Sequence, residues 1–306
     1  MNKILIIKHG SLGDIILAFS ALASIRNHYK NSKIFLLTER KYFTLFYRSP
    51  YVDNCIEDDR KNNLLSSLFR LKNLIRYEFD LIIDLQNSKR TFFYNLLFRS
   101  FISAKISSSR PFVHYRYRIP KQGTETVSEG LFNQLKMLGI KKINIENYSW
   151  LKSEINEKIM KPLALFIPGV SVNGFNKQWQ PHKFAEVAKF LEKHNYTICI
   201  IGNTEDTKSA IPIINSCKNI LNKIDQSPPE IIYSLALNSK IIFSNDTGPG
   251  HVASLSKNNF VWIVNDNNVS KANQPLGDHV YKVKSDSVKN ISSNEIISLI
   301  KRLNLF

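Results

Sequence analysis

One stretch of the chain combines a glycine- and proline-rich turn with hydroxyl and imidazole side chains. It reads Ser-Asn-Asp-Thr-Gly-Pro-Gly-His-Val-Ala-Ser and covers residues 244–254. The β-branched and aromatic residues before it predict a buried strand, and the residues after it can begin a helix. The backbone N–H groups of Thr247, Gly248 and the first helical turn would then converge on one point, where the helix dipole favours an anion. We predict that this turn binds phosphate; an ordinary connection of an α/β protein is the alternative.

A second turn, Gly10-Ser-Leu-Gly13, follows a predicted strand and precedes a helix that begins at Asp14. The turn lacks the third glycine of the Gly-x-Gly-x-x-Gly fingerprint and is therefore a weak indication of a dinucleotide site. A carboxylate at the start of a helix accepts hydrogen bonds from free N–H groups. On position alone, this capping role for Asp14 is favoured over catalysis.

Basic and aromatic residues alternate between Arg110 and Lys121, where the arginines are Arg110, Arg116 and Arg118. Guanidinium groups pair with phosphate or carboxylate, and the interleaved rings can stack on sugars or bases. This 110–121 loop is therefore a candidate binding site, with a solvated basic loop as an equal alternative. The preceding segment, 90–101, has Phe and Leu at helical spacing, and we favour a helix that faces the core over one that lies in a membrane interface.

Strands and helices alternate along the chain, as in parallel α/β folds. The first series has strands at 3–7, 33–38, 55–56 and 79–85 and helices at 14–29, 64–77, 90–101 and 126–138. The second has strands at 163–167, 196–201, 240–244 and 260–264, helices at 182–194, 228–237 and 293–303, and a further helix that starts at 202–206. The polar segment 141–161 separates the two series, and 306 residues suit two domains. We predict domains at 1–150 and 151–306, and leave open that the last helix packs back on the first domain.

The composition limits the partners and the location of the protein. A net charge of +17 attracts nucleic acid, anionic lipid or phosphorylated substrates, although such a Lys- and Asn-rich composition also arises from genome bias. We see no apolar run of about 18 residues and no signal peptide, and therefore expect a cytoplasmic protein. The cysteines, Cys55, Cys199 and Cys217, are odd in number and widely spaced, which predicts structural thiols and no zinc site.

Five motifs, in this order, resemble those of the ADP-heptose:lipopolysaccharide heptosyltransferases of glycosyltransferase family 9. They are Gly10-Ser-Leu-Gly-Asp14, Asp84-Leu-Gln86, Pro168-Gly169 with Lys177-Gln-Trp179, Gly202 with Glu205, and Asn245-Asp-Thr-Gly-Pro-Gly-His251. The resemblance implies a GT-B fold, in which two Rossmann-like domains face a cleft. It also implies an inverting sugar transfer that uses a nucleotide-sugar donor and needs no cofactor or metal ion.

The resemblance further implies roles for individual residues. Asp14 stands at the position of the base that takes the proton from the acceptor hydroxyl. The donor side, which stabilises the departing nucleoside diphosphate, comprises Lys177, Glu205, Thr247, Gly248 and His251. The acceptor side would comprise Gly13 and, from the charge of the 110–121 loop, Arg110, Arg116 and Arg118, which would bind an anionic acceptor. Asp246 would brace the turn, and Trp179 would pack in the core.

The partners implied are a nucleotide sugar, ADP-linked in the family, and an anionic glycolipid or glycan such as the lipopolysaccharide core. We expect a monomer in peripheral contact with the inner membrane and no nucleic acid. The family often has Gly-Pro-Thr at the end of the strand after the donor turn, where this chain has Trp262-Ile-Val-Asn-Asp266. Another nucleotide sugar therefore stays open, as do a GT-B epimerase or hydrolase and a non-catalytic basic protein that binds membrane or nucleic acid.

Overall fold

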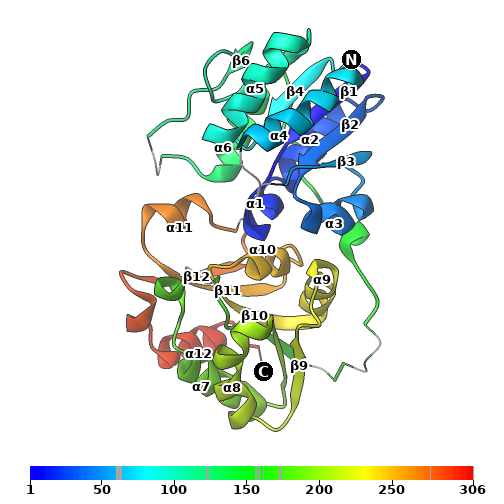
Figure 1. The fold of residues 1–306 in the computed structure, drawn as a ribbon. Helices are drawn as coiled ribbons and strands as arrows, with labels where there is room; N and C mark the ends of the chain where they lie inside the picture. Colours follow the sequence, from blue (N-terminus) through cyan, green and yellow to red (C-terminus); the bar gives the residue numbers. More distant parts are fainter. Residues whose placement is uncertain are drawn as a thin grey trace. The chain divides into compact units, whose positions relative to one another are not determined.

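The computed structural model describes residues 1–59, 64–121, 124–155, 157, 159–160, 162–171, 174–275 and 277–305. The chain forms two compact units, unit 1 at Met1–Glu146 and unit 2 at Asn147–Phe306 (Figure 1). Part of the polar segment predicted at 141–161, namely residues 156, 158 and 161, lies outside the described residues. In the part of the chain that is described, no helix has the length and apolar character needed to cross a membrane.

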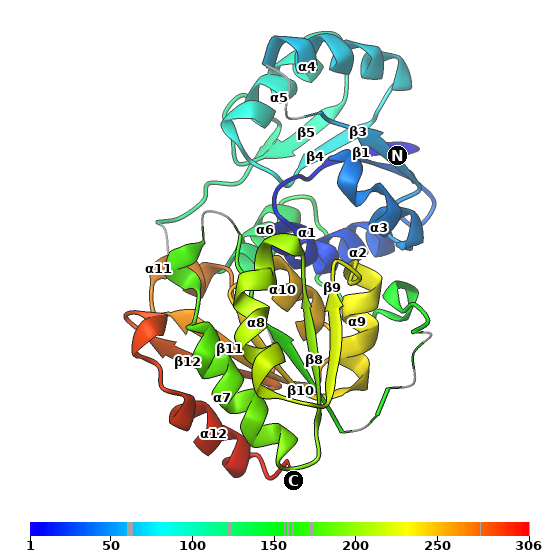
Figure 2. The same cartoon turned by 60° about the horizontal axis from the view of Figure 1, so that its bottom comes forward.

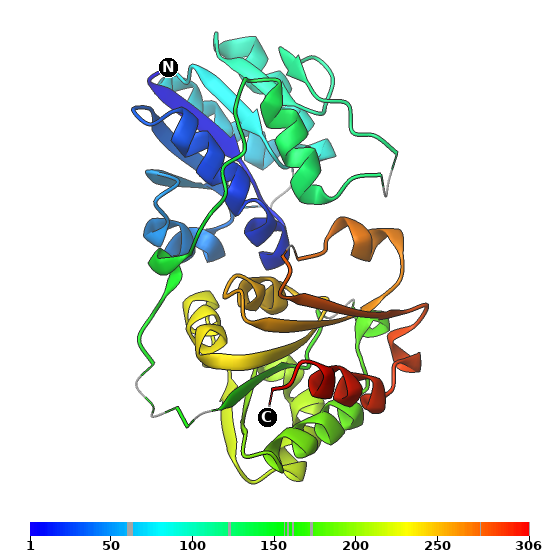
Figure 3. The ribbon, with the colours of Figure 1, turned by 180° about the vertical axis from the view of Figure 1, so that it is seen from behind.

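Unit 1 is built on a parallel six-stranded sheet with the order β3-β2-β1-β4-β5-β6. The strands are β1 (Lys3–Ile7), β2 (Lys33–Thr38), β3 (Asn54–Glu57), β4 (Leu81–Asp84), β5 (Lys105–Ser108) and β6 (Tyr115–Arg116). The helices are α1 (Leu12–Leu17), α2 (Phe19–His28), α3 (Phe43–Arg48), α4 (Leu64–Leu71), α5 (Lys89–Phe101) and α6 (Val127–Lys136). Because α2 packs beside α6 and α4 beside α5, both faces of the sheet are covered (Figure 3). The central strands are therefore continuous apolar runs.

Unit 2 repeats this plan with the order β12-β11-β10-β7-β8-β9, again all parallel. Its strands are β7 (Leu163–Ile167), β8 (Thr197–Gly202), β9 (Ile220–Ile224), β10 (Ser239–Asn245), β11 (Asn259–Asn265) and β12 (Val280–Ser285). Its helices are α7 (Pro181–Glu192), α8 (Thr207–Ser216), α9 (Pro229–Asn238), α10 (Gly248–Ser254), α11 (Asn268–Ala272) and α12 (Ser293–Arg302). The last helix, α12, packs on α7 within unit 2 (Figure 2).

Two predicted helices are divided in the structure. The helix predicted at 64–77 is an α-helix only over α4 and continues as a 3-10 helix at Lys72–Tyr77. The helix predicted at 14–29 is divided into α1 and α2 at Ala18, and its first segment begins before Asp14, at Leu12. Helix α5 does face the core, but with Thr91, Tyr94, Asn95 and Phe98, whereas Phe93 and Phe101 of the predicted apolar set are exposed. The core-facing helix predicted at 90–101 is therefore confirmed, and Leu97 of its apolar residues packs against the core, although Phe93 and Phe101 do not.

Candidate active site

Asp14 occupies the first turn of α1, and its carboxylate is held there by Ser11. The Asp14 Oδ2 atom accepts hydrogen bonds from the Ser11 backbone N–H and the Ser11 hydroxyl, each at 2.8 Å. Ser11 is the N-cap residue, and its side chain accepts a bond from the Asp14 N–H. This reciprocal capping box fixes the carboxylate in one place. The capping role expected for Asp14 is thus present, and Gly13 lies buried beside it in α1.

The carboxylate of Asp14 rests directly on Gly10. A Cβ atom at Gly10 would lie 2.6 Å from Asp14 Oδ2, and the φ of Gly10 is +114°, so a side chain would be strained and would displace the acid. The Tyr42 hydroxyl donates to the Gly10 carbonyl at 2.8 Å, and the Gly10 N–H donates to Glu39. These contacts, which the sequence analysis missed, hold the turn from the carboxyl end of β2.

The neighbouring strand β4 ends in a buried carboxylate that organises the next loops. Asp84 Oδ1 accepts bonds from the backbone N–H groups of Gln86 and Asn87, and Asp84 Oδ2 accepts from Asn95 and Ser108. Gln86 in turn accepts a bond from the His9 N–H, across the boundary between β1 and β4. The strand order reverses at this boundary, which is where ligands bind in doubly wound sheets.

A buried polar chain lies beneath the Asp14 turn. His9 Nε2 lies 3.1 Å from Asp58 Oδ2, and the Tyr94 hydroxyl donates to the same oxygen at 2.9 Å. Arg90 Nε donates to the Tyr94 hydroxyl. Burial raises the pKa of Asp58, but hydrogen bonds from His9 and Tyr94 and the charge of Arg90 outweigh it and leave the pKa below its usual value. The backbone next to Gly10 is therefore anchored in the core by a carboxylate that stays ionised.

The arginines of the 110–121 loop differ in how firmly they are held. Arg110 Nε donates to the Asn87 carbonyl at 2.7 Å, and its backbone N–H donates to Ser108, so Arg110 belongs to the carboxyl edge of the sheet. Arg116 makes a longer bond, 3.4 Å, to the Ser109 carbonyl. The side chains of Arg116 and Arg118 are exposed. Only Arg110 is thus rigidly placed near the loops that follow β1 and β4.

In unit 2, the residues that follow β10 bring together one carboxylate and two basic side chains. Lys177 Nζ lies 2.8 Å from Asp246 Oδ2, and His251 Nε2 lies 3.9 Å from Asp246 Oδ1. The side chain of Asp246 is 5% exposed and that of Lys177 is 33% exposed, so the ammonium reaches solvent while its partner is buried. The turn therefore carries an accessible cation oriented by a buried acid.

The backbone of the turn offers fewer donors than the sequence predicted. Thr247 is the N-cap of α10: its side chain accepts from the Gly250 N–H, and its carbonyl accepts from the His251 N–H. Pro249 has no N–H to donate. The expected convergence of the whole first turn was therefore wrong, because these N–H groups are used inside the turn and those of Thr247 and Gly248 are left.

A buried tryptophan places Lys177. Trp179 is fully buried, its ring nitrogen donates to the Ile291 carbonyl at 2.8 Å, and its backbone N–H donates to Asn245 Oδ1 at 3.0 Å. Asn245 also donates to the Pro168 carbonyl, which joins the ends of β10 and β7. The packing role expected for Trp179 is thus present, and it ties the segment that carries Lys177 to the end of β10.

Glu205 is exposed on the turn after β8. Its neighbour Asp206 is half-buried and packs against another turn of unit 2. A Cβ atom at Gly169 would lie 2.0 Å from Asp206 Oδ1, so this carboxylate packs on the Gly169 backbone at the end of β7. Burial raises the pKa of Asp206, and the nearby charge of Glu205 adds to the effect. The capping box of Asn203 and Asp206 is the signal in the sequence that could have found it.

Comparisons with known proteins identify the family. The model of "Glycosyltransferase family 9 (heptosyltransferase)" matches residues 68–266, which is more than half of the chain. The chain belongs to glycosyltransferase family 9.

Individual relatives agree with this assignment. The chain is 22% identical to lipooligosaccharide heptosyltransferase 2 of Haemophilus ducreyi over 285 residues, which cover 82% of this chain and 79% of the relative. Its fold matches a family 9 glycosyl transferase from Veillonella parvula with a TM-score of 0.84, at 19% identity and with 99% and 97% of the two chains covered. It also matches the E. coli ADP-heptose lps heptosyltransferase II with a TM-score of 0.78, at 17% identity and with 99% and 98% covered.

As a family 9 member, this chain is a glycosyltransferase with the two-domain α/β architecture of the GT-B class. The prediction of fold class and family is confirmed, and the alternative of a non-catalytic basic protein was wrong. Lys177, Asp246 and His251 all lie inside the matched residues, whereas Asp14 precedes them. Among the described residues, no group of three or more His, Cys, Asp and Glu side chains is placed to hold a metal ion.

The three cysteines form no disulfide. Cys55, Cys199 and Cys217 are all free, and Cys199 is buried in β8. Burial raises the pKa of Cys55 to about 11 and also raises the pKa values of the other two. Thiolate is therefore scarce at neutral pH, which agrees with structural thiols.

Proposed function

We propose that this glycosyltransferase catalyses an inverting sugar transfer in which Asp14 is the general base. The base removes the proton from an acceptor hydroxyl while that oxygen attacks the anomeric carbon of the donor and the bond to the nucleoside diphosphate breaks. The geometry in support is the contact set of Asp14: Ser11 and Gly10 hold one carboxylate oxygen at the carboxyl edge of the sheet. A carboxylate fixed in this place suits proton transfer. A general base must first lie within hydrogen-bond reach of the proton that it removes, and only then does its pKa matter.

The observation that carries the donor half of the proposal is the pair of Lys177 and Asp246 beside His251, at the end of β10 and inside the family match. Negative charge grows on the diphosphate as the sugar leaves, and a preoriented ammonium stabilises it without a metal ion. The Lys177 Nζ atom would exchange part of its contact with Asp246 for the phosphate. Thr247 and Gly248 add backbone donors, and Glu205, on the turn after β8, contacts hydroxyl groups of the donor.

The donor is proposed to be ADP-heptose. The support is the description of the family and the names of two relatives, a lipooligosaccharide heptosyltransferase and an ADP-heptose lps heptosyltransferase. The acceptor is then a lipopolysaccharide core or a related anionic glycan, and Gly13, Arg110, Arg116 and Arg118 of unit 1 form its side of the reaction. Transfer from another nucleotide sugar is the second candidate, because Trp262-Ile-Val-Asn-Asp266 replaces the Gly-Pro-Thr end of β11.

Calorimetry with ADP, UDP, GDP and CMP, without divalent metal, tests the donor. We expect ADP to bind most tightly and Lys177→Ala to weaken that binding. A preference for UDP or GDP would keep the glycosyltransferase and reject ADP-heptose. Absence of nucleotide binding to the wild-type protein would reject the donor site.

Exposed apolar side chains on α4 and α5 support a cytoplasmic enzyme in peripheral contact with the membrane. Leu65 and Phe69, each 77% exposed, lie one turn apart on α4, and Phe93 and Phe101 are exposed on α5 beside it. The exposed cations on and next to these helices are Lys72, Arg76, Lys89 and Arg99. Apolar groups among cations favour the headgroup region of an anionic bilayer.

Flotation with phosphatidylglycerol vesicles and with phosphatidylcholine vesicles tests this contact. We expect the protein to float with the anionic vesicles and the double variant Leu65→Ser, Phe69→Ser to float less. Equal flotation of both proteins would reject the α4–α5 surface.

A further inference from the structure

The segment that carries Lys177 is a short turn at the surface of unit 2. It is a 3-10 turn at Phe175–Lys177, in which the Lys177 N–H donates to the Gly174 carbonyl at 2.8 Å. Phe175 is 69% exposed, Asn176 is also exposed, and Lys177 is half-buried. A turn with so little buried apolar surface gains little rigidity from packing. Its position therefore depends on hydrogen bonds to the elements beside it.

Two asparagines at the ends of neighbouring strands hold this turn from either side. The strand β10 ends in Asn245 and the strand β11 in Asn265, and the two strands pair in parallel (Figure 1). Asn265 Nδ2 donates to the carbonyl of Asn176, the residue before Lys177, at 3.0 Å. Asn245 Oδ1 accepts the bond from Trp179, two residues after Lys177. The lysine thus lies between two points that are bonded to the carboxyl end of the sheet.

The side chain of Asn265 is itself held in one orientation. Asn265 is 8% exposed, and its Oδ1 atom accepts a bond from the Val288 N–H at 2.7 Å. The oxygen of the amide can only accept and its nitrogen can only donate, so the two bonds together fix which end faces Asn176. The backbone after Asn265 is also paired, because the Asp266 N–H donates to the Ser285 carbonyl at 2.7 Å. Asn265 is therefore a preoriented donor for the turn.

The position of the turn decides where the Lys177 ammonium lies. Lys177 Nζ contacts Asp246 Oδ2 at 2.8 Å, and Asp246 directly follows Asn245. A lysine loses backbone and side-chain freedom when its ammonium binds a phosphate. Where the backbone before the lysine is already held, part of that loss has occurred before the ligand arrives. A turn released from Asn265 would present the same ammonium in many positions, with weaker binding as the result.

We propose that Asn265 is a positioning residue of the donor site, which fixes the Lys177 ammonium for the diphosphate of the donor by holding the Asn176 carbonyl. This inference deepens the proposed function and rests on it for the role of Lys177. Asn265 belongs to Trp262-Ile-Val-Asn-Asp266, the segment that stands in place of Gly-Pro-Thr. This departure from the family pattern therefore supplies a contact to the segment that carries the lysine.

Hydrogen exchange of the segment 174–179, followed by mass spectrometry on the full chain without ligand, tests the contact itself. Asn265→Asp keeps an acceptor for the Val288 N–H but removes the donor to Asn176, so the segment should exchange at least about threefold faster. Asn258→Asp is the matched control, because Asn258 Nδ2 donates to backbone carbonyls at 2.8 Å just before the start of β11, at its opposite end. Unchanged exchange in Asn265→Asp, or equal acceleration in Asn258→Asp, would overturn the proposal.

A double-mutant cycle with Lys177→Met tests whether Asn265 acts through the lysine. Calorimetry uses ADP, or UDP or GDP if either binds the wild type more tightly. Asn265→Asp should weaken binding by about 3- to 10-fold in the wild-type background. In the Lys177→Met background it should change the Kd by less than about twofold, because no ammonium is left to position. Equal weakening in both backgrounds would mean a general structural effect or a direct effect of the new charge, and would overturn the proposal.

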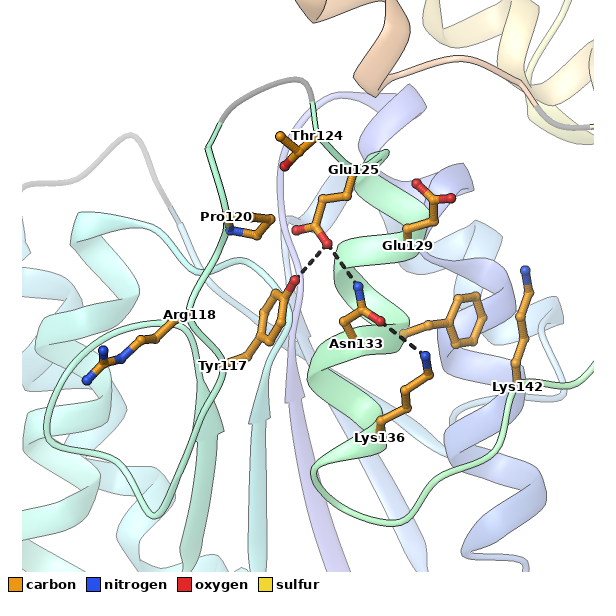
Figure 4. Close-up of a pocket in the computed structure, with 10 residues that line it drawn as sticks. Tyr117, Arg118, Pro120, Thr124, Glu125, Glu129, Asn133, Lys136 and Lys142 are labelled. Atoms are coloured by element: carbon orange, nitrogen blue, oxygen red, sulfur yellow. Dashed lines mark hydrogen bonds between the residues drawn. The ribbon is translucent and has the colours of Figure 1, made fainter.

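Two further variants separate positioning from charge. Asn265→Leu is neutral and lacks the donor, and should weaken nucleotide binding as Asn265→Asp does. Lys136→Met lowers the net charge by the same amount as Asn265→Asp, and Lys136 lines a pocket of about 650 Å³ beside α6 in unit 1, together with Glu125 (Figure 4). This control should keep the nucleotide Kd of the wild type. A wild-type Kd in Asn265→Leu, or an equal loss of binding in Lys136→Met, would reject the positioning role.

The positioning role and the donor assignment fail in different ways. If no nucleotide binds to the wild type, or if Lys177→Met binds it as the wild type does, the donor assignment falls, while faster exchange in Asn265→Asp still supports the hold on the turn. If Lys177→Met weakens nucleotide binding and Asn265→Asp does not, the donor assignment stands and Asn265 is not a positioning residue.

Discussion

The two units share one strand order, but the loops at their switch points carry opposite charges. In unit 1, the loops after β1 and β4 meet through the bond from the His9 N–H to Gln86, and the group they present is the carboxylate of Asp14. In unit 2, the loops after β7 and β10 meet through Asn245 and the Pro168 carbonyl, and the exposed group is the ammonium of Lys177. Because the sheets are alike, the chemistry is decided by a few loop residues.

Both units also place a glycine after their first strand and pack a carboxylate on it. In unit 1 the acid is Asp14, from the helix that follows the same loop. In unit 2 the acid over Gly169 is Asp206, which comes from the loop of the next strand. The Asp246 carboxylate is instead covered by Lys177. The comparison teaches that unit 1 presents a carboxylate at its switch point, while unit 2 pairs its carboxylate with Lys177 and presents an ammonium group.

The largest effect is expected when the acid of unit 1 is removed. Asp14→Asn keeps the size of the side chain but cannot accept a proton, so kcat should fall by about 10² to 10⁴. The nucleotide Kd, measured by calorimetry, should not change, because the groups proposed to bind the donor lie in unit 2. Asp80→Asn, which alters an acid bonded to Asn2 and Lys3 at the opposite edge of the sheet, serves as control. If Asp14→Asn loses nucleotide binding as well as activity, the assignment of base and donor groups to different units is wrong.

The complementary change is Lys177→Met in unit 2. Loss of a charged hydrogen bond to phosphate should weaken nucleotide binding by about 10- to 100-fold. Lys240→Met, in a lysine exposed near the amino-terminal end of β10, should leave the Kd unchanged. Calorimetry at two salt concentrations checks both variants. If Lys177→Met has the nucleotide Kd of the wild type, the ion pair of Lys177 and Asp246 has only a structural role.

Asp58→Asn tests the support below the Asp14 turn. The buried His9 and Tyr94 side chains lose a charged acceptor, so the free energy of unfolding should fall by about 1–3 kcal/mol at pH 7. Because the pKa of Asp58 is lowered in the folded protein, its stabilisation is present above the ordinary value of 3.8 and is lost as the pH falls below it. Urea unfolding at pH 7 and pH 3.5 should therefore show a difference between wild type and variant that shrinks in acid. If the difference in the free energy of unfolding between wild type and Asp58→Asn is the same at both pH values, the Asp58 carboxylate does not stabilise the fold in its ionised form.

The smallest effect separates backbone strain from the contact with Asp14. Gly10→Ala and Gly139→Ala both place alanine at positive φ, +114° and +73°, but a Cβ atom at Gly139 meets nothing within 4 Å. Each should lower the free energy of unfolding by about 1–2 kcal/mol through strain. Gly10→Ala alone should also lower kcat, since it displaces the carboxylate. Thermal unfolding and a transfer assay distinguish the two; matching kcat values in both variants would mean that Asp14 need not be held.

Much of the two sheets was predictable from the apolar runs in the sequence. The strands β1, β2 and β7 have the bounds predicted from their apolar runs, because each is buried on both faces and needs no other partner to be recognised. The strands β5, β6, β9 and β12 were missed, and β6 is a two-residue strand in the loop predicted at 110–121. β9 and β12 are partly exposed, and β5 is polar but buried because Ser107 and Ser108 bond to Gln134, Asp84 and Asn87.

For the candidate site, the sequence determined which residue types follow each strand, because glycine, proline and capping acids act locally through backbone conformation. It also determined the family, through motifs whose order survives low identity. Only the tertiary structure decided that Trp179 is tied to Asn245 and Asp58 to His9, and that Glu125 rests against Gly130 in a pocket. Most of these contacts join residues tens of positions apart. Their partners are chosen by the packing of strands and helices, which no local pattern records.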